Sequence, residues 1–190
     1  MIDQNFTGRR RPFRSSFVLV LLCVMVLGGC QTGEPPLTPA AASFKKEVQD
    51  CLNRLSQGLA ESIVKKDVPA LNETLKQIEP DALKLCRMCP FRIGILDKTG
   101  NALTVYPYKP EAVGNFSNYD VVVRTMKNQK INQQRFYLQD GSQMYIICVP
   151  LFQGDDLVGI MALSLSAADA KSRWGLSEKE FLAIDFNRKS

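Results

Sequence analysis

The chain has 190 residues, of which 45% are hydrophobic and 23% charged, which predicts one globular domain large enough to bury a core without disulfides. The formal net charge of +5 comes mainly from the start of the chain: without Arg9, Arg10, Arg11, Arg14 and Asp3, the 24 basic and 19 acidic residues become 20 and 18, which excludes the strongly basic surface of a nucleic-acid-binding protein. The absence of histidine excludes imidazole metal sites, histidine acid–base catalysis, covalent c-type haem and a histidine pH switch.

Residues 1–29 are predicted to be an export signal. A basic start precedes the apolar run FVLVLLCVMVL, Phe17 to Leu27, and small residues follow it. The run is about half of the ~20 residues that a helix needs to span a bilayer, so a permanent transmembrane helix is not expected.

The end of this segment, Leu27-Gly28-Gly29-Cys30, resembles the lipobox of bacterial lipoproteins. The resemblance implies that Cys30 becomes the mature N-terminus and carries acyl chains such as palmitate, enough for stable anchoring. Gln31 favours, again by resemblance, the outer membrane on its periplasmic side. The alternative is an uncleaved or ordinarily cleaved signal peptide with Cys30 incidental.

Residues 30–42 are rich in Thr, Gly, Pro and Ala and predict a flexible tether, with Thr38 and Pro39 able to open a helix. Apolar residues then recur at spacings of three and four and predict one long amphipathic helix, through Phe44, Val48, Cys51, Leu52, Leu55, Leu59 and Ile63.

A second helix is predicted after Lys65-Lys66-Asp67, with Asp67 as its cap and Pro69 in its first turn. Its apolar stripe comprises Leu71, Leu75, Ile78, Ala82 and Leu85. Because the connection is short, the two helices are expected to lie antiparallel.

Five strands are predicted beyond this hairpin, over residues 91–97, 102–106, 133–139, 143–152 and 157–166. Tight-turn compositions separate three pairs of them, at Lys98-Thr99-Gly100-Asn101, Asp140-Gly141-Ser142 and Gln153-Gly154-Asp155-Asp156. The fold class predicted is therefore α+β, with a five-stranded antiparallel sheet and the helical hairpin packed against it.

Between the second and third strands, a loop at residues 107–116 precedes a helix that Ser117 or Asn118 is expected to cap. We expect Tyr119, Val122, Val123 and Met126 on one side of this helix and an ion pair between Asp120 and Arg124 on the other. Ser177 with Glu180 predicts a capping box for a last short helix through Phe186.

Three stretches together resemble the Cache family, the extracytoplasmic PAS-like sensor domains of bacterial chemoreceptors and histidine kinases. They are ILDKTGNALTVYP, GNFSNYDVVVRTMKNQK and YIICVPLFQGDDLVGIMALSLS, and the resemblance covers about residues 44–168. It implies a sensor domain over residues 43–168, with residues 169–190 as a helical tail. It also implies a pocket on one face of the sheet, roofed by the 107–116 loop and the following helix, that binds a small metabolite such as an amino acid or a carboxylate.

Strand alternation places Arg135 and Tyr137 on one face of the third strand and puts Tyr145 on one face of the fourth. An arginine followed two residues later by an aromatic resembles the anion-reading arrangement of carboxylate-binding members, and a guanidinium can hold a carboxylate by two hydrogen bonds. Tyr106 at the loop entrance and Arg124 are further candidate ligand-binding residues. The alternative is that Arg135 pairs with surface acids, that Tyr137 packs in the core and that Tyr106 only fixes the loop.

Four cysteines, Cys51, Cys86, Cys89 and Cys148, remain once the signal peptide and Cys30 are set aside, and in an exported protein they favour disulfides. We expect a bridge from Cys51 to Cys86 or Cys89, with Cys148 a buried thiol or the partner of the remaining cysteine. Redox sensing by Cys86 and Cys89 is a second hypothesis, although their motif follows a helix rather than opening one. A four-thiolate metal site is a third.

The chain is thus predicted to be a lipid-anchored, non-enzymatic sensor that needs no cofactor or metal. Its partner is expected to be a membrane receptor or histidine kinase, since the sequence contains no kinase or cyclase motif and no second transmembrane segment. The rival hypotheses are a periplasmic disulfide-exchange or redox-sensing protein and a scaffold that docks a partner without a ligand.

Overall fold

A computed structural model describes residues 36–55, 58–85, 92–106 and 114–188, and all of these except Pro36 belong to one compact unit, Leu37–Ser190. The predicted signal peptide, Cys30 and most of the tether lie outside the described residues. None of the described helices combines the length and the hydropathy that crossing a membrane requires.

The centre of the unit is a five-stranded sheet in the order β2-β1-β5-β4-β3, in which every neighbouring pair is antiparallel. This confirms the predicted sheet. The strands are β1 Arg92–Asp97, β2 Ala102–Tyr106, β3 Asn132–Tyr137, β4 Gln143–Gln153 and β5 Asp156–Ser166.

Glycine makes the tight turns possible. Gly100, Gly141 and Gly154 have φ values of 81°, 80° and 63°, a left-handed region that glycine enters without the steric cost of a Cβ atom. The three turns that the sequence predicted from composition therefore form where they were expected.

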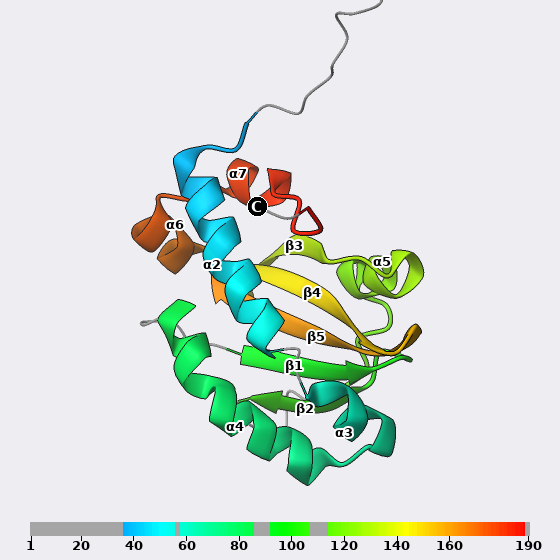
Figure 1. Ribbon diagram of the computed structural model, residues 1–190. Coiled ribbons are helices and arrows are strands. Elements are labelled where there is room, and N and C mark those ends of the chain that lie inside the picture. The colour runs from blue at the N-terminus through cyan, green and yellow to red at the C-terminus, as the bar shows by residue number, and fades with distance from the viewer. Residues whose placement is uncertain (1–35, 56–57, 86–91, 107–113, 189–190) are drawn as a thin grey trace, which may run out of the picture. The chain divides into compact units, whose positions relative to one another are not determined.

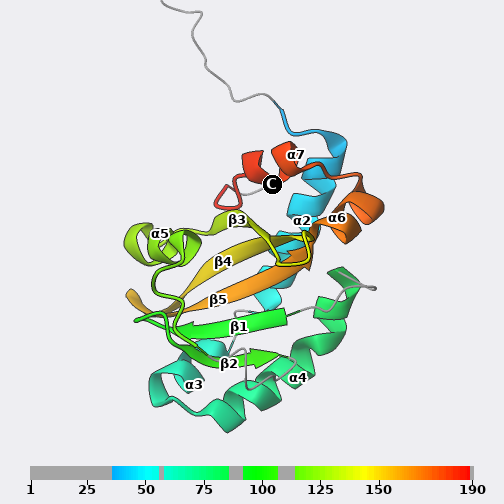
Figure 2. The same cartoon turned by 180° about the vertical axis from the view of Figure 1, so that it is seen from behind.

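Helices cover both faces of the sheet. They are α2 Pro39–Leu55, α3 Leu59–Lys65, α4 Val68–Leu85, α5 Asp120–Asn128, α6 Ala167–Trp174 and α7 Glu178–Ala183. Figure 1 shows α2, α3 and α4 in front of the sheet, and the reverse view in Figure 2 shows α5 on the opposite side.

The single long helix predicted over residues 44–63 is wrong, because the chain divides there into α2 and α3. Gly58 precedes α3 with φ 78° and ψ −6°, a left-handed conformation that turns the chain out of the α2 axis. The predicted turn before α4 is confirmed, since the Asp67 carboxylate accepts a hydrogen bond from the Ala70 N–H at 3.0 Å.

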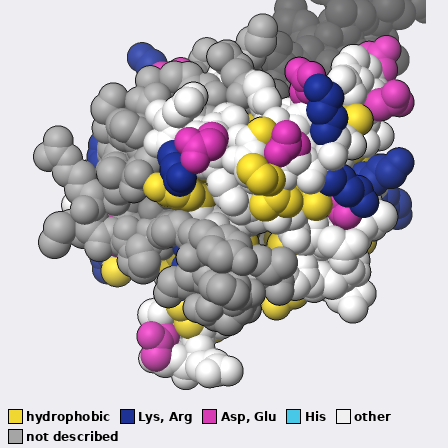
Figure 3. Space-filling view, turned by 90° about the horizontal axis from the view of Figure 1, so that it is seen from below, with side chains coloured by type: hydrophobic (Ala, Val, Ile, Leu, Met, Phe, Trp, Pro, Cys, Tyr) yellow, Lys and Arg dark blue, Asp and Glu magenta, His cyan; other side chains and the backbone are white. Residues whose placement is uncertain are grey.

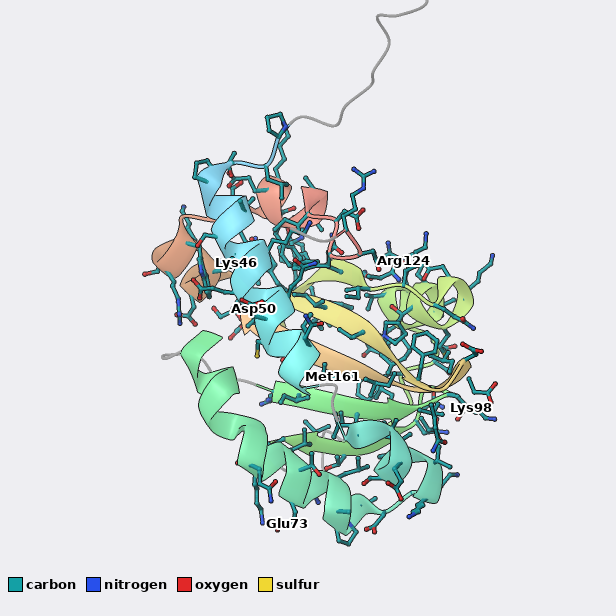
Figure 4. All side chains as sticks on the ribbon, in the orientation of Figure 1. Lys46, Asp50, Glu73, Lys98, Arg124 and Met161 are labelled. Atoms are coloured by element: carbon teal, nitrogen blue, oxygen red, sulfur yellow. The ribbon has the colours of Figure 1, made fainter. Side chains whose placement is uncertain are left out.

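The larger core lies on the face that α2, α3 and α4 cover, which we call the helical face. Ile93, Ile147, Met161 and Leu163 are buried there beneath the helices, and the labelled Met161 is seen behind α2 in Figure 4. Burying large apolar side chains on both the sheet and the helices supplies the main driving force for this packing.

The C-terminal tail belongs to the same core. The ring of Phe44 on α2 makes edge contacts with Trp174, Phe181 and Phe186, with centroids 5.0, 6.2 and 6.3 Å apart. The predicted capping box of α7 is confirmed, with the Ser177 and Glu180 side chains each bonded to the other residue's backbone N–H. The tail therefore holds the start of α2 as well as ending the chain.

The opposite side, which we call the α5 face, carries the smaller core, and it corrects the expected orientation of α5. Val121, Val122 and Thr125 are the buried residues of this helix, whereas Tyr119 and Val123 are 44% and 41% exposed. Apolar residues occur nearly all around the first turn, so periodicity did not decide which side would be buried. The N-cap is Tyr119, not Ser117 or Asn118, and it makes no side-chain cap bond.

The outer surface of α3 and α4 is an ordinary solvated one. Ion pairs Glu61–Lys65 and Glu73–Lys76 join exposed side chains at 2.6 and 2.7 Å. Seen from below, acidic, basic and hydrophobic side chains are interspersed on the described part of this surface (Figure 3). Exposed pairs of this kind contribute little to stability.

Candidate functional site

Small side chains cross the middle of the α5 face. Gly94 on β1, Ala162 on β5 and Cys148 on β4 are register partners in succession, and we call them the small-residue row. A Cβ atom at Gly94 would meet nothing nearer than the Ala162 Cβ at 3.8 Å. Gly94 and Ala162 are only half-buried, so the sheet surface is low and accessible here.

The neighbouring row is more polar. Arg92, Ser164, Ile146 and Gln134 are successive register partners across β1, β5, β4 and β3. Ser164 donates a hydrogen bond to the Arg92 carbonyl at 3.1 Å. The side-chain oxygen of Gln134 is buried and, among the described residues, receives no hydrogen bond.

The polar residue beside Gln134 on the same face is fully used. The amide of Asn132 donates to Thr125 Oγ1 at 3.2 Å, to Asn128 Oδ1 at 3.0 Å and to the Lys130 carbonyl at 2.8 Å. Thr125 in turn donates to the Val121 carbonyl at 2.8 Å. Asn132 and Thr125 thus have hydrogen-bond partners under α5, whereas the side-chain oxygen of Gln134 has none among the described residues.

Three aromatic rings border this face at the start of α5. Tyr119 lies between Phe116 and Phe136, with ring centroids 5.3 and 5.7 Å apart. Phe116 and Phe136 also pack on the small core of the α5 face. The rings give the site an apolar border that can contact a small organic molecule.

The segment leading into α5 is fixed to the β1–β2 turn. The Phe116 N–H donates to the Gly100 carbonyl at 2.7 Å, and the Asn115 amide donates to Asn101 Oδ1 at 2.7 Å. A Cβ atom at Gly100 would lie 2.8 Å from the Ser117 Cα, so only glycine permits this approach. The 107–113 part of the loop that was predicted to roof the pocket lies outside the described residues.

The turn itself is held by Asp97. Its carboxylate accepts hydrogen bonds from the Thr99 N–H at 2.8 Å and the Asn101 N–H at 3.0 Å. Partial burial raises the pKa of this carboxyl, but the hydrogen bonds from Thr99 and Asn101 together bring it below its ordinary value. The anchor of the α5 segment is therefore a charged, preorganised turn.

Cys148 is a buried free thiol in the small-residue row. Burial raises its pKa to about 12, although the charge of Arg124 acts in the opposite direction. A thiol so protonated is a poor nucleophile and a poor metal ligand. The described residues contain no cluster of His, Cys, Asp and Glu that could hold a metal ion.

The cysteine pairing stays a prediction. Cys51 packs in the core of the helical face, whereas Cys148 packs on the α5 face, so the sheet separates these two. Cys86 and Cys89, which the disulfide and redox hypotheses require, lie outside the described residues.

Three predicted ligand residues come together, but on the helical face. Arg135 is the register partner of Tyr145, its guanidinium lies 4.4 Å from the ring centroid of Tyr137, and it is ion-paired with Glu178 of α7. Tyr145 is buried, and burial raises the pKa of its hydroxyl despite the nearby Arg135. Tyr137 is 59% exposed and does not pack in the core.

The other two candidates lie elsewhere. Tyr106 pairs in register with Ile93, near the opposite edge of the sheet. Arg124 lies on α5 (Figure 4). It makes the predicted ion pair with Asp120 at 3.1 Å and donates to the Gln133 carbonyl at 3.4 Å. The five residues therefore do not converge beneath α5, which corrects the expected location.

Gln134 was not among the candidate residues of the sequence analysis. It stands in the polar run Asn132-Gln133-Gln134-Arg135, where composition gives no reason to choose one residue. Its alternation with Phe136 was the available signal, since residues two apart on a strand share a face.

No family model and no curated protein sequence matches this chain. Among solved structures, it is similar to a domain of a protein assigned to the sensory box/GGDEF family of Vibrio parahaemolyticus, with a TM-score of 0.51, 11% identity, and coverage of 74% of this chain and 61% of that one. It is also similar to the extracellular domain of a protein assigned as a histidine kinase, vpHK1S-Z8, with a TM-score of 0.51, 11% identity, and coverage of 86% and 63%.

At such identities the likeness shows a shared fold, and it agrees with the predicted α+β fold built on a five-stranded antiparallel sheet. The chain spans less than two thirds of the length of each of these structures.

Proposed function

We propose that this protein is an extracytoplasmic sensor that binds a small molecule on the α5 face and passes the change in occupancy to a partner protein. The observation that carries the proposal is the sheet order β2-β1-β5-β4-β3 with α5 over a low, small-residue surface, in a fold shared with an extracellular histidine kinase domain. Fold alone does not assign function, so the site itself has to support the proposal.

The α5 face has the chemical character of a small-molecule site. Such sites are largely apolar and contain a few placed polar groups. Here the small-residue row lowers the sheet surface, and the rings of Phe116, Tyr119 and Phe136 form an apolar border. Gln134 offers a buried acceptor that receives no hydrogen bond from any residue the structure describes.

A non-catalytic role agrees with the chemistry of this face. The nucleophile there, Cys148, is buried and held protonated by its pKa of about 12. A catalytic site would need a base within hydrogen-bond reach of a nucleophile.

The anchor and the partner belong to the same proposal. The lipobox-like sequence ending at Cys30 supports attachment to the periplasmic face of a membrane, with the outer membrane favoured. A membrane receptor or histidine kinase is the partner proposed, because the protein would have to convert occupancy into a signal through contact.

A second location for the ligand is the Arg135 region of the helical face. The specific observation in its favour is that Arg135 already holds a carboxylate, that of Glu178, with Tyr137 beside it. A carboxylate ligand would have to compete with this internal ion pair, which makes α7 the element that would move.

A thermal-shift screen of amino acids, carboxylates and uncharged amides on the purified protein tests the proposal. A ligand at a hundredfold its dissociation constant adds about 2.7 kcal/mol to the stability of the native state. Gly94→Ala adds a methyl group to the α5 face, at a position where the structure has room for it. The variant should therefore show a smaller rise in melting temperature with a ligand bound on that face.

Arg135→Ala should reduce the ligand-induced rise in melting temperature only if the ligand occupies the helical face. If no compound stabilises the protein and neither variant changes its response, the sensor proposal fails.

A further inference from the structure

We propose that the α5 face selects an uncharged small molecule that donates a hydrogen bond to Gln134, rather than an amino acid or a carboxylate. This inference rests on the proposed function and names the ligand class of the same site. It starts from the one buried side-chain polar atom that lacks a hydrogen bond among the described residues.

Gln134 stands out among three consecutive amide residues of β3. Asn132 has three acceptors for its amide under α5, and on the helical face Gln133 donates to the Ile184 carbonyl. The Gln134 oxygen alone is buried without a hydrogen bond among the described residues. Leaving a buried acceptor unpaired costs free energy, so such an atom in a native protein calls for an explanation.

The neighbours of Gln134 on the α5 face are small or half-buried side chains. Ile146 is its register partner on β4, and the small-residue row lies two residues along the strands, at Cys148 and Ala162. Adjacent strands are about 4.8 Å apart, so the row from Gln134 to Arg92 spans roughly 14 Å. Ile146 and Ala162 are half-buried, so a molecule of a few heavy atoms can contact them from solvent. The Gln134 oxygen is closed to solvent in the free protein, so its side-chain amide would turn towards an N–H or O–H group of that molecule.

The charges of this face argue against an ionic ligand. The described residues of β1 to β5 that point to the α5 face include one charged side chain near the polar row, the exposed Arg92 at its far end. Arg124 on α5 is already bonded to Asp120 and to the Gln133 carbonyl. Among the described residues of the sheet, no carboxylate lies beside Gln134 to pair with a buried ammonium. A carboxylate has no proton to donate to the Gln134 oxygen, so it would leave that acceptor unpaired, whereas a neutral N–H or O–H donor would satisfy it.

The experiment compares head groups on one apolar body. Butyramide, butyrate, butylammonium and N,N-dimethylbutyramide are titrated separately into the ¹⁵N-labelled purified protein at millimolar concentration, and amide chemical shifts are followed. We expect butyramide to shift the signals of Gly94, Ala162 and the Gln134 side chain, and the dimethyl amide, which has no N–H donor, to shift them at least tenfold less at equal concentration.

Two variants test Gln134, both in the free protein and with butyramide. Gln134→Met keeps the length of the side chain and removes the unpaired oxygen, so the melting temperature should rise while the butyramide shifts disappear. The matched control is Gln133→Met, which loses a bonded amide on the other face and should lower the melting temperature without affecting the butyramide shifts.

The outcomes separate this inference from the proposed function. If butyrate or butylammonium binds the α5 face in preference to butyramide, the inferred ligand class is wrong, but the sensor proposal is not affected. A lower melting temperature for Gln134→Met overturns it as well, because the oxygen would then be satisfied in the free protein. If none of the four probes shifts any α5-face signal, and the thermal-shift screen is also negative, both proposals fail.

Discussion

Tyr145 of β4 lies flat against Phe181 of α7, with ring centroids 4.0 Å apart and ring planes 6° apart. Both rings are buried, so the last helix of the chain is stacked on the central sheet. The contact joins residues 36 positions apart in the sequence and makes the C-terminal tail part of the core.

Phe181→Ala should therefore destabilise the protein by about 3–5 kcal/mol, because it removes a buried ring and leaves a cavity beside Tyr145 and Phe44. Urea unfolding followed by circular dichroism measures the change. Leu182→Ala is the matched control, since its side chain is 47% exposed and its loss should change stability by about 0.5 kcal/mol or less. Equal effects of the two substitutions would show that the tail does not belong to the core.

Gly159→Ala should destabilise the protein by about 1–3 kcal/mol. A Cβ atom there would clash with the Leu96 carbonyl oxygen and lie 3.2 Å from Ile63 Cγ2, so β5 or α3 must shift. Gly114→Ala is the control, because nothing lies within 4 Å of the added atom. Thermal unfolding of both variants checks the difference, and a Gly159→Ala protein as stable as the unaltered one would rule out this packing of α3 on β5.

Cys148 should resist alkylation in the folded protein at neutral pH. Its side chain is fully buried and its pKa is raised to about 12, so the reactive thiolate is both scarce and inaccessible. Iodoacetamide treatment with peptide mass mapping should leave Cys148 unmodified in the native state and modify it in urea. Rapid native labelling would contradict its burial under α5.

Glu180 should make stability depend on pH at acidic values. Hydrogen bonds from the side chains of Ser177 and Thr38 lower its pKa from 4.5 to about 2, so the folded protein binds its proton less tightly than the unfolded chain. The stabilisation is fully present above about pH 4.5 and is lost as the pH falls towards 2.

Glu180→Gln should flatten this dependence, as measured by urea unfolding between pH 2 and pH 6. The carboxylate is fully exposed, so the effect is expected to be modest and reduced by salt. An unchanged pH profile in the variant would show that the bond from Thr38 to α7 does not persist in solution.

Local patterns were sufficient to predict the strands and their turns. Alternating apolar residues and a glycine at each tight turn are properties of a few consecutive residues, so the five strands and the capping box of Ser177 with Glu180 were found within one or two positions. The prediction of one long helix was wrong at Gly58. Apolar residues continue at helical spacing on both sides of this glycine, so periodicity alone does not show that the helix axis changes there.

The sequence by itself determined which residues of a strand share a face: Arg135 with Tyr137, and Gln134 with Phe136. Only the tertiary structure decided which face each helix covers, and so placed Arg135 under α7 and Gln134 under α5. The physical reason is that side-chain alternation has a period of two along a strand, whereas the choice between two apolar faces depends on packing with helices far away in the sequence.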